Sequence, residues 1–367
     1  MAGMGVPYIG NETKEIVEIN NDNRWLRQRL DECSTERSSK PEPQETGKMK
    51  KTGFVFDEGY LLHNTGEWHP ETADRLRVIV NGLKESGLLE KLIPIKAEPA
   101  KQRWIEAVHH VKYIMRFSDA CALGMSELDH QENVICRDSY DAALLAVGGV
   151  LKAIDAMMAG EIDTAFCAVR PPGHHAEIDQ AMGFCYFNNV AIGARYLQRQ
   201  YGIERVGIID FDVHHGNGTE HIFEADPTVF YYSIHEHPSF AYPGTGRDFD
   251  KGSGEGDGYT LNSPVLPGRG DNDYRRMLTE DLIPAFKKFQ PQAMLISAGF
   301  DAHTSDLMSG VNLSTDGYDF VSELIMNLAN SLTGGKVISV LEGGYNLQIL
   351  PLLVENHIKH LAGLRGV

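Results

Sequence analysis

The chain has 367 residues, of which 42% are hydrophobic, and this is enough to bury a large core. Its 34 Lys and Arg face 51 Asp and Glu, a formal net charge of −17 at pH 7 that repels phosphate backbones and argues against direct nucleic-acid binding. The absence of an apolar run of about 18 residues, of a basic leader and of any C-x-x-C pair among the five scattered cysteines predicts a cytoplasmic protein that stays off membranes.

Residues 1–51 form the first predicted unit, a polar N-terminal extension or linker. They hold nine basic and nine acidic residues, so the whole formal charge falls on residues 52–367. The extension ends in a stretch rich in Pro, Ser, Glu and Lys that is too poor in apolar residues to pack. Two amphipathic pieces, EIVEI and RWLRQRL, have the pattern of docking segments, but a loosely held extension is the simpler interpretation.

From residue 52 onward, apolar segments alternate with segments of helical period. The helical pattern is clearest in YDAALLAVGGVLKAIDAMMAG, residues 140–160. The predicted strands are 164–169, 205–211, 228–234, 293–298 and 336–341. Their continuous apolar and β-branched character is typical of parallel strands that helices cover on both faces. The sequence therefore predicts an α/β fold.

Residues whose polar side chains can bind ligands or transfer protons follow four of these strands. The motifs in chain order are RPPGHH, DVHHGNG, GFDAH and EGGYN. Because the carboxyl ends of parallel strands meet at one edge of the sheet, where ligands bind, we expect these four segments to converge on one site.

Asp212 and His214 form a D-x-H pair at a strand end, so both side chains can point the same way. Asp301, in GFDAH, is the candidate third ligand. Two carboxylates and one imidazole leave a fourth position open, as catalytic zinc sites do, whereas structural zinc sites are usually closed by Cys and His. The same donors suit Fe(II) or Co(II), which leaves the metal used in the cell open. Each residue alone is equally compatible with a hydrogen-bonded polar group.

His174 and His175 are adjacent in RPPGHH. Beside a metal, one imidazole can take a proton from water while the other holds charge near the reacting oxygen. Asp210 and Asn217 are the expected partners of their second ring nitrogens. The hydroxyl of Tyr345, in a Gly-rich turn, is a candidate donor to an oxyanion, although a packing aromatic would leave the same pattern.

Six motifs carry a resemblance to a known family. RPPGHH, GFCYFNN, IIDFDVHHGNGT, YPGTG, SAGFDAH and LEGGYN occur in the order seen in histone deacetylases and their bacterial relatives, over most of residues 52–350. The H-P-E-x-x-x-R signature in the segment that begins FVFDEGYLL resembles the class II-like branch, with its histone deacetylase-like and acetylpolyamine amidohydrolases. The resemblance implies an arginase/deacetylase-like three-layer sandwich with a central, mainly parallel sheet, and a catalytic domain over 52–367.

The resemblance also implies a reaction. The expected enzyme is a zinc-dependent hydrolase that removes the acetyl group from N-acetyl-lysine of proteins or peptides and releases acetate. His175 would activate the attacking water and protonate the leaving amine, while His174 would tune charge and orientation. The positions that the resemblance assigns are intact: Asp212, His214 and Asp301 for one Zn²⁺ per chain, His174 and His175 with Asp210 and Asn217 as the catalytic pair and its partners, and Tyr345 as the oxyanion donor.

The family's tunnel to the metal is walled by two aromatics, which correspond here to Phe184 and Tyr242. Gly183 and Met308 are further candidate substrate-binding residues. The segment after GFDAH reads Leu307-Met308 where many class II-like relatives have Pro-Leu, so the expectation for the pocket rim is weaker there.

A structural K⁺ site is also implied by the resemblance, built from Asp210, Ser233 and main-chain carbonyl groups that include Ile234. A second departure lies beside His175. Its expected partner Asn217 stands where class I members have Asp, and an amide stabilises an imidazolium less than a carboxylate does.

Several alternatives stay open. An acetylpolyamine amidohydrolase would use the same chemistry on a small cation, and Asp129 and Glu132 could supply carboxylates near its entrance, unless they belong to a solvated acidic loop. A catalytically silent module that binds acetylated ligands is an alternative of another class. An arginase-type ureohydrolase would need two bridged metals. The partners are thus acetylated lysines or polyamines rather than nucleic acid or membrane, and a homo-oligomer is compatible with the sequence.

Overall fold

The structure is a computed structural model, and it describes residues 49–364. The predicted extension with its two amphipathic pieces lies outside the described residues, apart from its last three positions. There Lys50 donates its backbone N–H to the carbonyl of Ala362 at 3.0 Å, and Lys51 donates to the carboxylate of Asp163 at 2.8 Å. The first strand begins at Thr52, the residue at which the domain is expected to start.

An eight-stranded sheet forms the centre of the domain, and all its strand pairs are parallel. The strand order is β2-β1-β5-β10-β9-β6-β7-β8. The strands are β1 (Thr52–Val55), β2 (Ile93–Ile95), β5 (Thr164–Cys167), β6 (Val206–Asp210), β7 (Val229–Glu236), β8 (Thr260–Val265), β9 (Ala293–Ala298) and β10 (Val337–Leu341), and a separate antiparallel pair consists of β3 (Glu127–Leu128) and β4 (His130–Val134).

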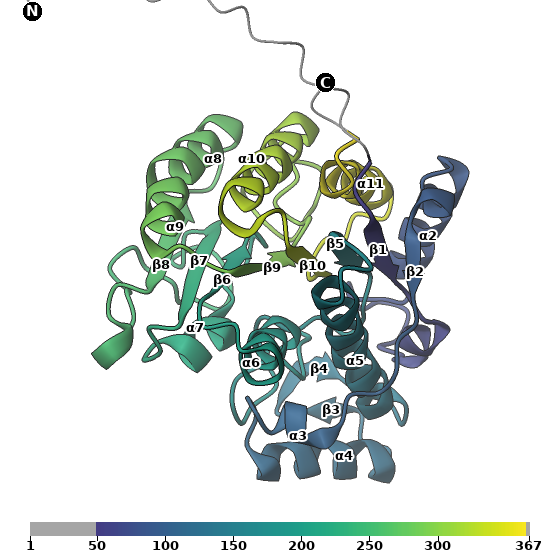
Figure 1. The fold of residues 1–367 in the computed structure, drawn as a ribbon. Coiled ribbons are helices and arrows are strands. Elements are labelled where there is room, and N and C mark those ends of the chain that lie inside the picture. The colour runs from purple at the N-terminus through teal and green to yellow at the C-terminus, as the bar shows by residue number, and fades with distance from the viewer. Residues whose placement is uncertain (1–48, 365–367) are drawn as a thin grey trace, which may run out of the picture. The chain divides into compact units, whose positions relative to one another are not determined.

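Helices cover both faces of the sheet, as Figure 1 shows. One layer consists of α2 (Asp74–Glu85), α8 (Asp271–Met277), α9 (Ile283–Phe289), α10 (Thr315–Thr333) and α11 (Leu350–Leu361). The other side holds α3 (Gln102–Ile105), α4 (Val111–Leu123), α5 (Ser139–Met158), α6 (Asn189–Tyr201) and α7 (Asn217–Phe223). Short turns of helix are η1 (Glu58–Leu62), η2 (Leu89–Lys91), η3 (Gly254–Gly256) and η4 (Leu278–Leu282). This is the predicted three-layer sandwich.

The central strands are buried along their whole length, which explains their continuous apolar sequences. The helices that cover them begin and end at residues suited to those places. Asn188 accepts the N–H of Ala191 at the start of α6, and Gly202 ends that helix in the left-handed conformation at φ 68°. Ser314 and Gly334 have the same roles in α10.

The five predicted strands are all present, with ends that shift by one or two residues, and the predicted helix 140–160 is α5. β1 overlaps the FVFDEGYLL segment that the resemblance identified, and the two remaining strands of the sheet had no clear signal. β2 is only three residues long and contains Pro94, and β8 reads TLNSPV with an internal proline. Both lie at edges of the sheet, where a proline costs no ladder hydrogen bond.

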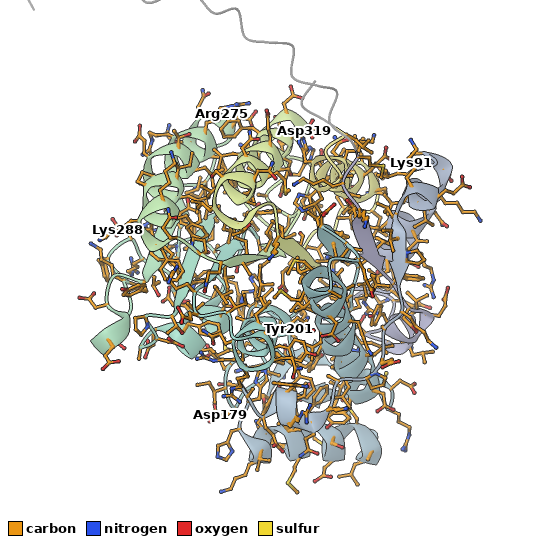
Figure 2. The ribbon with its side chains drawn as sticks, in the orientation of Figure 1. Lys91, Asp179, Tyr201, Arg275, Lys288 and Asp319 are labelled. Atoms are coloured by element: carbon orange, nitrogen blue, oxygen red, sulfur yellow. The ribbon has the colours of Figure 1, made fainter. Side chains whose placement is uncertain are left out.

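Between residues 49 and 364 no helix has the length and apolar character needed to cross a membrane. The four cysteines of this range, Cys121, Cys136, Cys167 and Cys185, are free thiols. Figure 2 shows the charged side chains of Lys91, Asp179, Arg275 and Lys288 at the periphery of the domain, around a densely filled interior.

Candidate active site

The predicted site residues follow the ends of four neighbouring strands. β5, β10, β9 and β6 are consecutive in the sheet, and the motifs RPPGHH, EGGYN, GFDAH and DVHHGNG follow them. Because these strands are parallel, their carboxyl ends lie at one edge, and segments far apart in the sequence meet there. The expected convergence therefore follows from the strand order.

Asp212, His214 and Asp301 form one buried cluster, in which the potential ligand atoms all lie within 4.8 Å of one another. Nδ1 of His214 is 3.2 Å from Oδ1 of Asp212 and 3.1 Å from Oδ2 of Asp301. Both aspartates are fully buried, and His214 is 8% exposed, so its ring is the member of the cluster that meets the cavity.

Backbone N–H groups orient the two carboxylates. Gly343 donates to Asp212 at 2.7 Å, and Val213 donates to Asp301 at 3.0 Å. Gly343 also leaves room for them, because a Cβ at this position would lie 2.1 Å from the Asp301 carboxylate. Gly343, the first glycine of EGGYN, is therefore required, because the two carboxylates lie too close to its Cα for any side chain to fit.

The cluster fits a divalent cation. Burial raises the pKa of Asp301 above its usual range, and the neighbouring charge of Asp212 raises it further. Two buried carboxylates with a single imidazole between them are unfavourable unless a positive charge compensates them. Oxygen and nitrogen donors in a set of three with an open side match the requirements of catalytic zinc.

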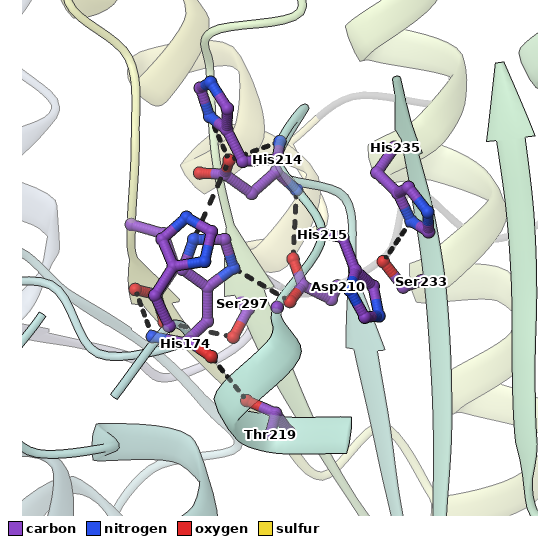
Figure 3. Close-up of polar contacts among 12 residues, drawn as sticks. His174, Asp210, His214, His215, Thr219, Ser233, His235 and Ser297 are labelled. Atoms are coloured by element: carbon purple, nitrogen blue, oxygen red, sulfur yellow. Dashed lines mark hydrogen bonds and ion pairs between the residues drawn. The ribbon is translucent and has the colours of Figure 1, made fainter. Parts of the chain in front are cut away.

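The tandem histidines lie beside this cluster, with ring centroids 4.0 Å apart. His174 donates from Nδ1 to Asp210 at 3.0 Å, a contact drawn in Figure 3. His175 donates from Nδ1 to Oδ1 of Asn217 at 2.8 Å. Both expected pairings are thus present in the structure, and Nε2 of His174 lies 3.9 Å from Oδ1 of Asp212.

The surroundings of His174 and His175 shift the pKa values of the two rings in opposite directions. Burial would lower the pKa of His174, but Asp210 and Asp212 raise it to about 10. Burial lowers the pKa of His175 well below its usual range, and the neighbouring rings of His174 and His214 lower it further. A cation bound at Asp212 would offset part of the field that charges His174. His175 is the neutral ring, the state that a general base requires.

A cavity of about 330 Å³ leads to the cluster. Its lining consists of Glu132, His175, Gly183, Phe184, His214, Tyr242, Met308 and Tyr345. The four predicted substrate-binding residues are all among them. The ring of Tyr242 stands edge-on to His175 at 5.1 Å, and that of Phe184 edge-on to Tyr345 at 6.1 Å.

A strained turn places Phe184 in the cavity wall. Gly183 and Phe184 have φ of 54° and 69°, the left-handed region that costs energy for a side chain such as Phe. The side-chain oxygen of Asn133 holds the turn by accepting the N–H of Phe184 at 2.9 Å. A Cβ on Gly183 would lie 2.3 Å from the ring of His175, so this turn also needs its glycine.

Tyr345 reaches the cavity from the turn after β10. Its backbone N–H donates to Asp306 at 2.7 Å, and the guanidinium of Arg75 lies 5.0 Å from the ring centroid. Arg75 also donates to the carbonyl of Gly344 at 2.7 Å. Burial raises the pKa of Tyr345 well above its usual range, so the phenol stays protonated and can donate a hydrogen bond.

The H-P-E-x-x-x-R signature builds the support beneath this turn. Glu71 accepts from Arg75 at 3.1 Å and from Nε and Nη2 of Arg170 at 2.6 and 2.8 Å. Burial raises the pKa of Glu71, but the two guanidinium groups outweigh burial and hold the pKa at about 2. The ion pairs therefore tie β5 and the first loop to the turn that carries Tyr345.

The two loop carboxylates considered for the entrance have different positions. Glu132, on β4, lines the cavity. Asp129 instead pairs with Arg116 at 2.9 Å and accepts the N–H of Ala181 at 2.8 Å, so it holds the loop together.

The predicted K⁺ residues lie on neighbouring strands. Asp210 is opposite Ser233 in the register of β6 and β7, and Ile234 is the next residue. The hydroxyl of Ser233 contacts Nδ1 of His235 at 2.7 Å (Figure 3). Asp210 already accepts from His174, Tyr231 and the N–H of Asp212. The cation site stays a prediction.

Three buried or half-buried carboxylates of the site had no distinct sequence signal. Glu342 accepts from the N–H groups of Gly173 and His174 at 2.7 and 3.2 Å, Asp306 holds Tyr345, and Glu177 lies behind Asn217. Glu342 and Glu177 do belong to the recognised motifs or their flanks, LEGGYN and GHHAE. Their partners are distant in sequence, so only the folded chain identifies what they hold.

Comparison with known proteins agrees with this geometry. The histone deacetylase domain model matches residues 69–361. The chain is 38% identical over 298 residues to a probable deacetylase of Archaeoglobus fulgidus, covering 81% of this chain and 82% of that protein. It is 34% identical over 334 residues to the histone deacetylase-like amidohydrolase of Pseudomonas aeruginosa, covering 86% and 87%.

Longer relatives and solved structures match as well. Histone deacetylase 5 of Arabidopsis thaliana is 37% identical over 321 residues, which cover 82% of this chain but only 47% of that protein. The crystal structure of the HDA15 HD domain superposes with a TM-score of 0.81 at 36% identity, covering 86% of this chain and 88% of that one. The chain belongs to the histone deacetylase family and has its arginase/deacetylase fold.

Proposed function

We propose that the chain is a zinc-dependent deacetylase that hydrolyses the acetyl amide of N-acetyl-lysine in proteins or peptides and releases acetate. The observation that carries this proposal is one narrow cavity whose lining includes His175, His214 and Tyr345, with Asp212 and Asp301 directly behind His214. A base, a metal-ligand set and an oxyanion donor thus face the same space.

A zinc ion held by Asp212, His214 and Asp301 would polarise the acyl carbonyl and acidify a water molecule. The chain's own residues then move the proton. Neutral His175, whose Nδ1 donates to Asn217, accepts a proton from the attacking water at Nε2 and returns it to the leaving amine.

Two further groups stabilise the charge that develops. The protonated phenol of Tyr345 donates a hydrogen bond to the carbonyl oxygen as it becomes negative. His174, paired with Asp210, keeps a positive charge next to the reaction centre. The C–N bond breaks as the amine is protonated, and the products are acetate and a free amine.

The cavity suits an acetylated amine at the end of a flexible aliphatic chain, as in N-acetyl-lysine or an acetylpolyamine. The rings of Phe184 and Tyr242 give it apolar walls, and Glu132 adds a carboxylate to its lining. An acetylpolyamine is the second candidate substrate, because Glu132 would attract the charged amines of such a molecule.

A two-metal ureohydrolase has weaker support. Among residues 49–364 the other grouping with metal-ligand donors is His174, Cys185 and Glu342. Its members already have partners: Glu342 accepts two backbone N–H groups and the hydroxyl of Ser297, and Cys185 donates to the carbonyl of Gly183. Burial also raises the pKa of the Cys185 thiol well above its usual range.

The deciding experiment is steady-state hydrolysis by the zinc-loaded chain of an acetyl-lysine peptide and, in parallel, of acetylspermidine and acetylputrescine, with a chelator control. We expect a higher kcat/KM on the peptide and loss of activity with the chelator. A higher kcat/KM on the polyamines would replace the first substrate class by the second. Binding of acetylated ligands without turnover would make the chain a silent module.

A further inference from the structure

The two histidines of the proposed catalytic pair have different partners at Nδ1. His174 has the carboxylate of Asp210, whereas His175 has the amide of Asn217. An amide has no charge, and it can present either its oxygen or its NH₂ group to the ring. If the NH₂ group faced His175, Nδ1 would have to accept, and the proton would move to Nε2, where the base needs a free lone pair.

Behind the amide lies a carboxylate that removes this ambiguity. Nδ2 of Asn217 donates to Oε1 of Glu177 at 2.5 Å, and His221 donates from Nδ1 to the same oxygen at 2.8 Å. An ionised carboxylate can only accept, so the NH₂ group of Asn217 must face Glu177 and its oxygen must face His175. The other acceptors near Nδ2, the carbonyl of His175 at 3.4 Å and the sulfur of Met182 at 3.5 Å, are more distant.

Two hydrogen bonds fix the backbone of Glu177. Its N–H donates to the carbonyl of Gln180 at 2.9 Å, and its carbonyl accepts from Nδ1 of His109 at 2.8 Å. Nε2 of His109 accepts the N–H of Asn188, which fixes the tautomer of that ring. Glu177, whose side chain is 15% exposed, is thus anchored next to a buried amide, with the 44% exposed side chain of His221 as its second partner.

We propose that Glu177 is a positioning residue for the reaction: through Asn217 it fixes the proton of His175 on Nδ1 and leaves Nε2 free to act as the base. The carboxylate also polarises the amide, so that Asn217 supports a positive charge on His175 better than an amide alone. This inference rests on the proposed function, because it assigns a role in that reaction.

The first test removes the acceptor. Glu177→Ala should lower kcat about 10- to 100-fold on the acetyl-lysine peptide, the usual effect of losing such a supporting contact, while KM and zinc content stay near those of the unchanged chain. Asp179→Asn is the matched control, since it removes an exposed carboxylate from the same loop, at the periphery in Figure 2, and should leave kcat unchanged. Equal kcat for Glu177→Ala and the control would overturn the proposal.

The second test returns the charge to a different position. Asn217→Asp alone places two carboxylates against each other and should lower kcat. In the Glu177→Ala background the same substitution puts a single carboxylate next to His175 and should raise kcat above that of Glu177→Ala. A merely structural role would make the double variant worse than either single one, and that result would contradict the proposal.

A third measurement does not depend on turnover. In ¹⁵N-histidine NMR spectra of the zinc-loaded chain, the ring of His175 should carry its proton on Nδ1, and Glu177→Gln should shift part of the population to Nε2, because a glutamine can also present its NH₂ group to Asn217. An unchanged tautomer in this variant would overturn the inference even if the chain is a deacetylase. Absence of turnover in the unchanged chain would instead remove the proposed function.

Discussion

His174 and His175 have the same covalent structure and adjacent positions, yet burial and charge give them opposite proton affinities. Asp210 and Asp212 raise the pKa of His174 to about 10, while burial and the neighbouring histidine rings keep that of His175 well below its usual range. At the scale of single residues, the role of a side chain in this site is therefore set by its partners.

Tyr345 offers the most direct test of such a role. Tyr345→Phe removes only the hydroxyl that would donate to the developing oxyanion, so we expect kcat to fall on the order of 10² to 10³. Zinc content should not change, because the metal ligands of the proposed site lie on other segments. Steady-state kinetics and metal analysis measure the two effects, and a near-normal kcat would mean that another group supplies the hydrogen bond.

Asp301 tests the metal-ligand set. Asp301→Ala leaves one carboxylate and one imidazole, which should reduce both bound zinc and turnover. Metal analysis after dialysis, with Tyr345→Phe as the comparison that keeps its metal, separates loss of the ion from loss of catalysis. Full zinc occupancy in Asp301→Ala would remove this residue from the proposed ligands.

Among the structural elements, short polar contacts join helices to each other, to strands and to loops. His357 of α11 contacts the hydroxyl of Ser322 on α10 at 2.8 Å and that of Ser339 on β10 at 2.9 Å. Glu342, at the end of β10, likewise holds the loop that carries His174. The contact of Glu342 holds the loop of His174 in a fixed position relative to the sheet.

His357 leads to a prediction of how the free energy of unfolding depends on pH. Burial lowers its pKa from 6.5 to about 3, so the unfolded chain takes up a proton below pH 6.5 that the folded chain refuses. The free energy of unfolding should therefore fall as the pH drops from 6.5 towards 3, by up to about 1.4 kcal/mol per pH unit for this group.

Urea unfolding at pH 7 and pH 5 measures this dependence. His357→Gln has no titrating ring, so it should lose less stability between the two pH values than the unchanged chain, whatever its stability at pH 7. An identical loss in both proteins would mean that His357 does not contribute to the acid sensitivity of the fold.

At the scale of the whole molecule, the net charge of −17 and the carboxylate of Glu132 in the cavity lining have the same sign. Both attract a cationic substrate, and the long-range part of this attraction is screened by salt. Capture of the proposed substrate should therefore depend on the entire charge distribution.

This attraction predicts a dependence on ionic strength. For a cationic acetyl-lysine peptide, kcat/KM should fall as added salt shortens the Debye length from about 30 Å to about 3 Å. A neutral acetyl-lysine peptide of the same length is the control and should show little change. Equal responses of the two peptides would show that capture does not depend on the charge of the domain.

The sequence by itself determined the parts of this protein that periodicity and local order encode. The five buried strands, the helix of residues 140–160 and the four motifs at strand ends could be recognised, because burial on both faces demands continuous apolar runs and parallel strands end at a common edge. The edge strands β2 and β8 were missed, since short segments with proline and polar residues carry no such pattern.

Only the tertiary structure decided which side chains support the site. Each of these supporting contacts joins residues that are tens to hundreds of positions apart in the chain, as in Glu177 with Asn217, Asp306 with Tyr345, Glu342 with His174, and Glu71 with Arg170. It also separated Glu132, which lines the cavity, from Asp129, which pairs with Arg116. The physical reason is that a carboxylate in a sequence has no fixed role until folding selects its hydrogen-bond partners and removes it from water.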